Sequence, residues 1–110
     1  MKVEQKDHTT IVKDTKVDLL SFIAAIESQI STFSKHNLII DLNAHKNLRL
    51  QDILLFSEIA KNFKKLKKSL VIVVSDFDFN ANTKKIMVVP SVLEAHDIIE
   101  MEEIERDLGF

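Results

Sequence analysis

Acidic side chains stand directly after two apolar runs of the chain, where they could bind a metal ion. Asp41 follows Leu38-Ile39-Ile40, and Asp76 and Asp78 follow the run 70–74. If both runs are parallel strands, their carboxyl ends meet at one edge of the sheet, where α/β proteins bind ligands. Carboxylate oxygens are the ligands that Mg²⁺ prefers. The spacing raises the hypothesis of a small metal-binding or phosphotransfer protein that uses Asp41, Asp76 and Asp78. The same residues also suit ordinary strand ends and turns.

The surrounding residues do not complete a known metal or nucleotide site. Residues 76–80 imitate the start of a calcium loop, but Ala81 replaces its glycine and Met87 replaces its final glutamate. The chain has no cysteine, and its one glycine is Gly109. The glycine-rich loops that cradle phosphates are therefore missing from the interior of the sequence. We expect no catalytic residue and no cofactor.

The apolar periodicity predicts alternating strands and helices. Short alternating segments at 2–6 and 9–13 suggest a hairpin, and apolar residues at helical spacing follow in 15–35 and 50–68. Strands are expected at 37–42, 70–74 and 85–89, and a last helix starts at a Ser91–Glu94 capping box. This helix should bury Ala95, Ile98, Met101 and Leu108 and end at Gly109, with Phe110 folded back. The prediction is one α/β domain over residues 1–110, with a mixed sheet of four to five strands and about three helices.

This order of elements resembles the STAS domain of anti-sigma factor antagonists. In that family a strand ends in Asp-Leu-Ser or a similar motif, as the strand here ends in Asp41-Leu42-Asn43. A loop then leads to a helix that opens with Asp-Ser-Ser-Gly-Leu, whose first serine is phosphorylated to block docking. Leu50 stands at that serine position, between Arg49 and Gln51, and Asp52 replaces the glycine. The resemblance implies a STAS-like fold without this phosphoryl switch, and residues 75–83 are too short and polar for the family's next helix.

A second resemblance concerns the tail. Residues 88–110, which begin Val88-Val89-Pro90-Ser91, resemble short bacterial proteins that carry the name ribonuclease Z. A nuclease of that class needs a clustered His-x-His-x-Asp-His motif on a far longer chain. The four histidines here, at positions 8, 36, 45 and 96, are isolated in the sequence. The resemblance therefore implies a partnership with such a nuclease rather than the activity itself.

Charge is distributed unevenly between the last two predicted helices. Lys61, Lys64, Lys65 and Lys68 share one helical face, whereas residues 94–107 hold seven acids and only one base. The acidic helix suits a basic partner surface, although solubility or pairing with the lysine face would also explain it. The net charge of −2 and the lack of interleaved aromatic residues do not favour nucleic acid. The absence of a long apolar run predicts a cytoplasmic protein without a membrane segment.

These observations favour a non-enzymatic, regulatory protein-binding module. We expect its binding surface to combine the loop after the first parallel strand, the start of the second helix and the acidic last helix. The residues expected to contact the partner are Asn43, Arg49, Leu50, Gln51 and Asp52, together with Glu102, Glu103 and Glu105. The sequence predicts neither the identity of the partner nor the oligomeric state.

Overall fold

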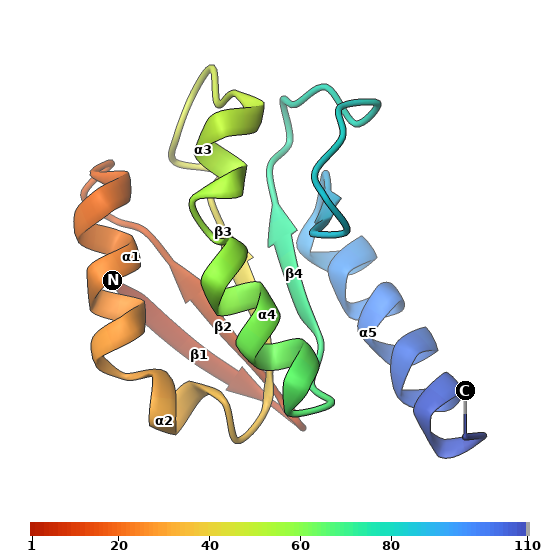
Figure 1. Cartoon of the computed structure of the whole chain (residues 1–110). Helices are drawn as coiled ribbons and strands as arrows, with labels where there is room; N and C mark the ends of the chain where they lie inside the picture. The colour runs from red at the N-terminus through yellow and green to blue at the C-terminus, as the bar shows by residue number, and fades with distance from the viewer. Residues whose placement is uncertain (110) are drawn as a thin grey trace.

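Five strands form one mixed sheet in the computed structural model, which describes residues 1–109. The strands are β1 (Lys2–Lys6), β2 (Thr9–Lys13), β3 (Asn37–Asp41), β4 (Leu70–Val73) and β5 (Met87–Val89), and they lie side by side in chain order. β1 and β2 pair as an antiparallel hairpin, and β2 to β5 run parallel. The expected α/β class and the mixed sheet of four to five strands are confirmed (Figure 1).

The central strands are apolar on both faces. All five residues of β3 are buried, and the run Val71-Ile72-Val73 of β4 has no exposed surface. A continuous apolar run is what a parallel strand needs when helices cover both of its sides. The edge strand β1 is exposed along its whole length and carries Lys2, Glu4 and Lys6. Charges on an exposed edge discourage pairing with another chain.

Five helices surround this sheet within residues 1–109, where the sequence predicts about three. They are α1 (Leu19–Ser28), α2 (Ile30–Phe33), α3 (Leu50–Leu54), α4 (Ser57–Lys65) and α5 (Val92–Asp107). The number differs because each of the first two predicted helices is interrupted. At the second interruption, the amides of Leu55 and Phe56 bond carbonyls only three residues back, in a tighter turn than the α-helix makes. This turn places Phe56 in the core without exposed surface.

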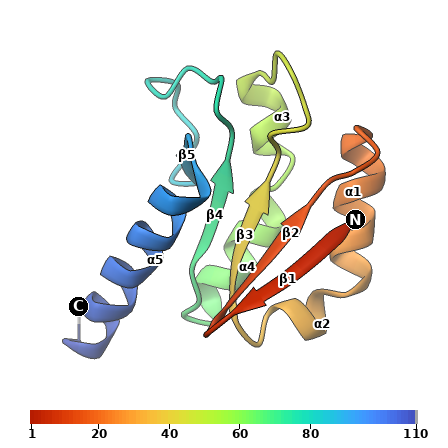
Figure 2. The same ribbon diagram turned by 180° about the vertical axis from the view of Figure 1, so that it is seen from behind.

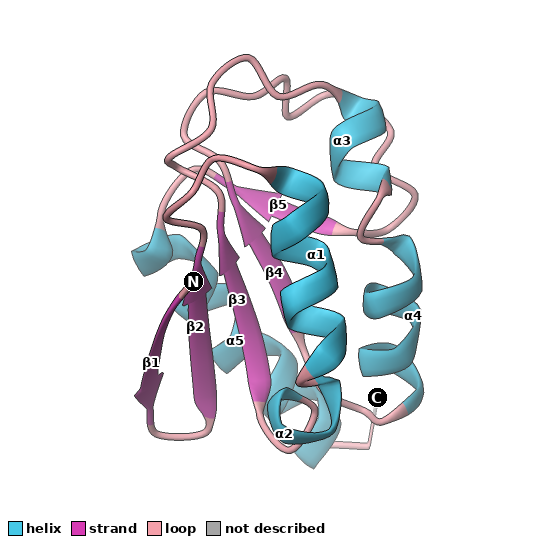
Figure 3. Ribbon diagram, turned by 90° about the vertical axis from the view of Figure 1, so that its left-hand side faces the viewer, coloured by secondary structure: helices cyan, strands magenta, loops and turns pink. Residues whose placement is uncertain are grey.

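The helices are divided between the two faces of the sheet (Figure 3). Helices α1 to α4 cover one face, where Phe22, Phe56 and Phe63 pack with Ile40 and Ile72. Helix α5 alone covers the other face, over a smaller cluster made by Ile39, Val71, Val73, Val89, Ala95 and Ile99. Figure 2 shows α5 on its own side of the strands.

The buried face of α5 differs from the expected one. Ala95 is buried as expected and Ile98 is half-buried, but Met101 and Leu108 are 56% and 67% exposed. The reason is that the side of α5 that packs on the sheet contains Ala95 and Ile99, followed by polar residues in the later turns. Met101 and Leu108 lie on the opposite side of the helix. Phe110, expected to fold back onto the last turn, lies outside the described residues.

The connection between β4 and β5 crosses from strand to parallel strand without a helix, as the sequence predicts for residues 75–83. The strand expected at 85–89 begins only at Met87. Lys84 and Lys85 have φ angles of 53° and 74°, which an extended strand does not allow. β5 consequently pairs with β4 only from Val71 onward.

Candidate functional site

The motif Asp41-Leu42-Asn43 holds the carboxyl edge of the sheet together. Asp41 Oδ1 accepts a hydrogen bond from the Asn43 amide at 2.9 Å, and Leu42 is fully buried between them. The Asn43 side chain accepts a hydrogen bond from the amide of Ser75 at 2.9 Å, so it joins the loop after β3 to the end of β4. Asn43, expected to contact a partner, therefore has a role inside the fold.

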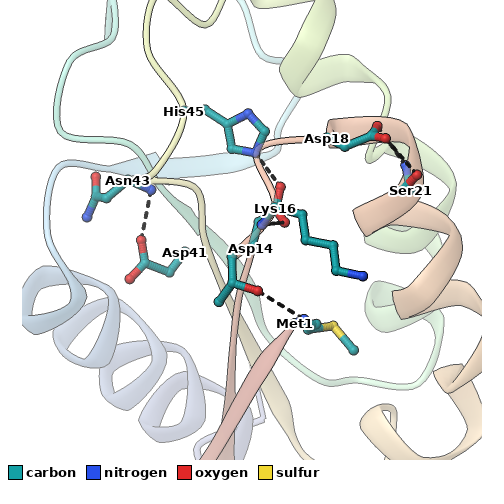
Figure 4. A network of polar contacts seen from close by, with 9 residues as sticks. Met1, Asp14, Lys16, Asp18, Ser21, Asp41, Asn43 and His45 are labelled. Carbon is teal, nitrogen blue, oxygen red and sulfur yellow. Dashed lines mark hydrogen bonds and ion pairs between the residues drawn. The ribbon is translucent and has the colours of Figure 1, made fainter.

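A buried, hydrogen-bonded pair of side chains lies beside this motif (Figure 4). His45 Nε2 is 2.6 Å from Asp14 Oδ2, and the two side chains are only 7% and 4% exposed. Asp14 also accepts a hydrogen bond from the Lys16 amide at 3.0 Å. The two residues are 31 positions apart, but they follow β2 and β3, which pair in parallel. Asp14 directly follows β2, but His45 stands four residues after the end of β3, so no local pattern of the sequence links the two.

The carboxylates of the metal-binding hypothesis do not converge. Asp41 is buried and turned to the Asn43 amide, whereas Asp76 and Asp78 are exposed. Asp78 accepts a hydrogen bond from the Asn80 amide at 3.0 Å, as acidic residues do in turns. Across residues 1–109, no three histidine or acidic side chains gather closely enough to hold a metal ion. Within this part of the chain, Asp41, Asp76 and Asp78 therefore do not form the metal cluster of the hypothesis.

The start of α3 carries the next group of expected partner contacts. Asp52 accepts a hydrogen bond from the Arg49 amide at 2.8 Å and thereby helps to start the helix. Leu50 is half-buried, whereas the side chains of Arg49 and Gln51 are exposed. Only Arg49 and Gln51 are therefore fully available to a partner at this place.

The acidic residues expected to bind a partner on α5 occupy three different environments. Glu102 accepts a hydrogen bond from the Ser69 hydroxyl at 2.5 Å, on the side facing the sheet. Arg106 joins the same cluster, because its guanidinium donates to Ser69 Oγ at 3.0 Å and to Asn37 Oδ1 at 3.4 Å. Glu103 is half-buried and Glu105 is exposed. These hydrogen bonds tie the last turns of α5 to the amino ends of β3 and β4.

The structure does not bring the two expected groups of contacts together. Helix α3 follows the carboxyl end of β3 on one face of the sheet, whereas α5 runs back toward the amino ends of the strands on the other face (Figures 1 and 2). Arg49 and Gln51 consequently belong to a different surface from Glu103 and Glu105. A binding surface formed by both groups at once is not present.

The solvent side of α5 carries an apolar stripe that includes Met101 and Leu108, two residues predicted to be buried. We call it the outer face of α5, and at 100° per residue its members fall within about 80° of arc. They are Leu93, Met101, Ile104 and Leu108, which are 73%, 56%, 53% and 67% exposed. The stripe extends over about 22 Å at 1.5 Å per residue. Asp97, which is exposed, lies in the same arc between Leu93 and Met101, so the contiguous part of the stripe is formed by Met101, Ile104 and Leu108. Exposed apolar side chains that adjoin one another in this way mark interaction sites.

Acidic residues border the outer face of α5 on both sides. By helical position, Glu100 and Asp107 lie along one side, and Glu94 and Glu105 lie along the other. Within residues 1–109, no salt bridge joins any of them to a lysine of α4. Arg106, the one base of the helix, is turned toward the sheet. The outer face is therefore an apolar strip in a negative field.

No helix within residues 1–109 is long and apolar enough to cross a membrane. A scan against protein-family models matches no family to this chain, and a search of curated proteins finds no match either.

Proposed function

We propose that this chain is a non-enzymatic, STAS-like regulatory module that docks a protein partner on the outer face of α5. The single observation that carries this proposal is the exposure of Leu93, Met101, Ile104 and Leu108 along one side of a helix whose opposite side is buried. Within residues 1–109, no part of the fold covers this apolar strip, and such strips bind amphipathic helices.

The chemistry of the outer face selects the partner. A second copy of α5 would place acid against acid, because both borders of the strip are acidic. Like charges in a contact oppose binding, whereas opposite charges raise the association rate and fix the register. The occupant is an amphipathic segment of another protein, with an apolar face bordered by lysine or arginine.

The STAS resemblance supports a regulatory role but not the family's phosphoryl switch. The order of elements agrees with the resemblance from the first hairpin to β4 and departs from it between β4 and β5, where the described chain has no helix. Leu50 has no hydroxyl to accept a phosphoryl group, and its side chain is half-buried at the start of α3. Binding on the outer face of α5 is therefore independent of phosphorylation at this position.

The test uses two double variants that remove apolar surface from different places. Met101→Ser/Ile104→Ser alters the outer face of α5, and Val17→Ser/Leu20→Ser removes two side chains that are 58% and 69% exposed near α1. Partners captured from native lysate by wild-type protein are then titrated with each purified variant. We expect the first variant to bind roughly tenfold more weakly or worse, as loss of apolar burial worth about 1.4 kcal/mol implies.

Charge reversal provides the second arm of the test. Glu100→Lys/Glu105→Lys, which reverses one exposed charge on each border of the outer face, should abolish capture and make the residual binding less sensitive to salt. Glu4→Lys/Glu27→Lys changes the net charge equally at exposed positions elsewhere and should leave capture intact. A partner that all four variants retain, or one whose contact surface is acidic, would show that the outer face of α5 is not the docking surface.

A further inference from the structure

Six lysines from separate parts of the chain line one groove at the side of the sheet. Lys61 and Lys64 come from α4, Lys67 and Lys68 from the loop that follows it, and Lys84 and Lys85 from the loop before β5. The groove consists of a cavity of about 420 Å³ and an adjoining one of about 350 Å³, which share Lys64 and Lys85 in their walls. The sequence predicts the lysine face of α4, but only the fold adds the second loop to it.

The groove exists because β5 is short. β5 begins at Met87, opposite Val71, so the first residue of β4, Leu70, lines the cavity. Helix α4 and its following loop form one wall, and the last turns of α5 form the other. The buried side chain of Ile86 joins Leu70 in the lining. The groove thus combines an apolar floor with a cationic rim.

Positive charge in the groove is not neutralised by the described part of the protein. Among residues 1–109, Lys61 pairs with Glu58 at 3.8 Å, and none of the other five lysines forms a salt bridge. Glu102, Glu105 and Arg106 of α5 also line the groove, so its seven basic side chains outnumber its two acidic ones. This concentration of cations occurs in a chain whose net charge is −2. Gathered like charges raise the electrostatic energy unless an anion joins them.

The backbone adds a second observation. Lys67, Lys84 and Lys85 adopt φ angles of 57°, 53° and 74°. Glycine or asparagine takes this left-handed region with less strain than lysine. Lysine therefore stands at three positions of the groove where the local conformation does not favour it, and strained residues of this kind cluster at ligand sites.

We propose that the groove binds a small molecule with two or more adjacent phosphate groups and a compact apolar part. Lysine ammonium groups bind phosphate as point charges. Ile86 and Leu70 supply the contact for the apolar part. A nucleic-acid strand fits less well, because the residues that line the groove include no aromatic side chain on which bases could stack.

The experiment measures binding of inorganic diphosphate, phenyl diphosphate and orthophosphate to the full chain by isothermal titration calorimetry at low salt. We expect one site per chain, with phenyl diphosphate the tightest and orthophosphate the weakest. Lys64→Gln/Lys85→Gln should weaken diphosphate binding roughly tenfold or more, since two close cations are removed. Lys16→Gln/Lys46→Gln removes the same charge from exposed positions after β2 and β3 and should leave binding unchanged.

Other outcomes would overturn the proposal. Equal weakening in both double variants would mean that the diphosphate responds only to overall charge. Equal affinity for diphosphate and phenyl diphosphate would show that the groove does not recognise an apolar part of the ligand. A single-stranded oligonucleotide that binds through Lys64 and Lys85, with no binding of either diphosphate, would assign the groove to nucleic acid. The outer face of α5 is untouched in all variants, so these results are independent of partner docking.

Discussion

At the scale of single residues, the carboxyl edge is organised by pairs that are far apart in the sequence. Asp14 and His45 form a buried pair 2.6 Å apart, and Asn43 joins its loop to Ser75. Each of these side chains could be taken for a ligand or a contact from its type alone. Their hydrogen bonds show instead that they hold neighbouring strand ends in register. Stability, rather than chemistry, is the first property that they should control.

The Asp14–His45 pair permits a double-mutant cycle. His45→Ala leaves the Asp14 carboxylate buried without its partner, and we expect a loss of about 3 kcal/mol in the free energy of unfolding. The double variant Asp14→Ala/His45→Ala should lose less than the sum of the two single variants. Urea unfolding followed by circular dichroism gives these values. His8→Ala, at an exposed position, serves as the control and should change stability by less than about 0.5 kcal/mol. Strictly additive losses would show that the pair is not coupled.

At this scale the sequence predicts the end of the strand but not the contacts that its residues make. Asp41-Leu42-Asn43 was predicted as a strand end and is one. The partners of Asn43 and His45 lie 32 and 31 residues away. A local sequence pattern cannot predict contacts between residues this far apart in the chain, because these contacts depend on which strands become neighbours. The sequence pattern also does not distinguish the acidic residues of α5 from one another. In the structure, Glu102 accepts a hydrogen bond from Ser69, whereas Glu105 is exposed to solvent.

At the scale of the elements, periodicity predicts faces well where only one side of a helix is apolar. Of the apolar residues at helical spacing in 50–68, Ile53, Phe56, Ile59 and Phe63 are buried and Ala60 is half-buried, but Leu66 is 54% exposed. Helix α5 has apolar residues on two opposite sides, so periodicity cannot choose between them. The sheet takes the side with Ala95 and Ile99, and the side with Met101 faces solvent. The interruptions of the long helices depend on tight turns that leave no mark in the apolar pattern.

The start of α1 gives a prediction that depends on pH. Asp18 is the N-cap, and the Ser21 hydroxyl donates to its carboxylate at 2.8 Å. This hydrogen bond, together with that of the Ser21 amide, holds the pKa of Asp18 below its usual value. The charged form is therefore favoured in the folded protein. Its contribution to stability is complete above the pKa of the unfolded chain and is lost as the pH falls through the lower pKa of the folded chain.

We accordingly expect the stability difference between wild type and Asp18→Ala to be largest at neutral pH and to shrink below about pH 4. Urea midpoints measured over a series of pH values give this difference. Ser28→Ala removes a non-titrating hydroxyl near the end of the same helix and provides the control. A difference for Asp18→Ala that is constant down to strongly acidic pH would contradict the role of the charged cap.

At the scale of the whole molecule, the two faces of the sheet are covered very unequally. Four helices share one face, whereas α5 alone covers the other. The same helix supplies the outer face for docking and one wall of the lysine groove. Its inner side is therefore structural, and its other sides are free for binding. We therefore expect removal of α5 to prevent folding, and substitutions on its outer face to leave the stability of the fold almost unchanged.

A chain that ends at Ser91 should fail to fold cooperatively. Without α5, Ile39, Val71 and Val73 lose their cover, although all three have no exposed surface in the full chain. Burial of each such side chain is worth about 1.5–3 kcal/mol, and the total stability of a domain is only about 5–15 kcal/mol. Met101→Ser/Ile104→Ser, which alters only the outer face of α5, should change the unfolding free energy by less than about 1 kcal/mol. Thermal unfolding and size-exclusion chromatography compare the two proteins. A sharp transition and a monomeric elution volume for residues 1–91 would show that the sheet is stable with one face uncovered, and α5 would then be an appended binding helix rather than part of the core.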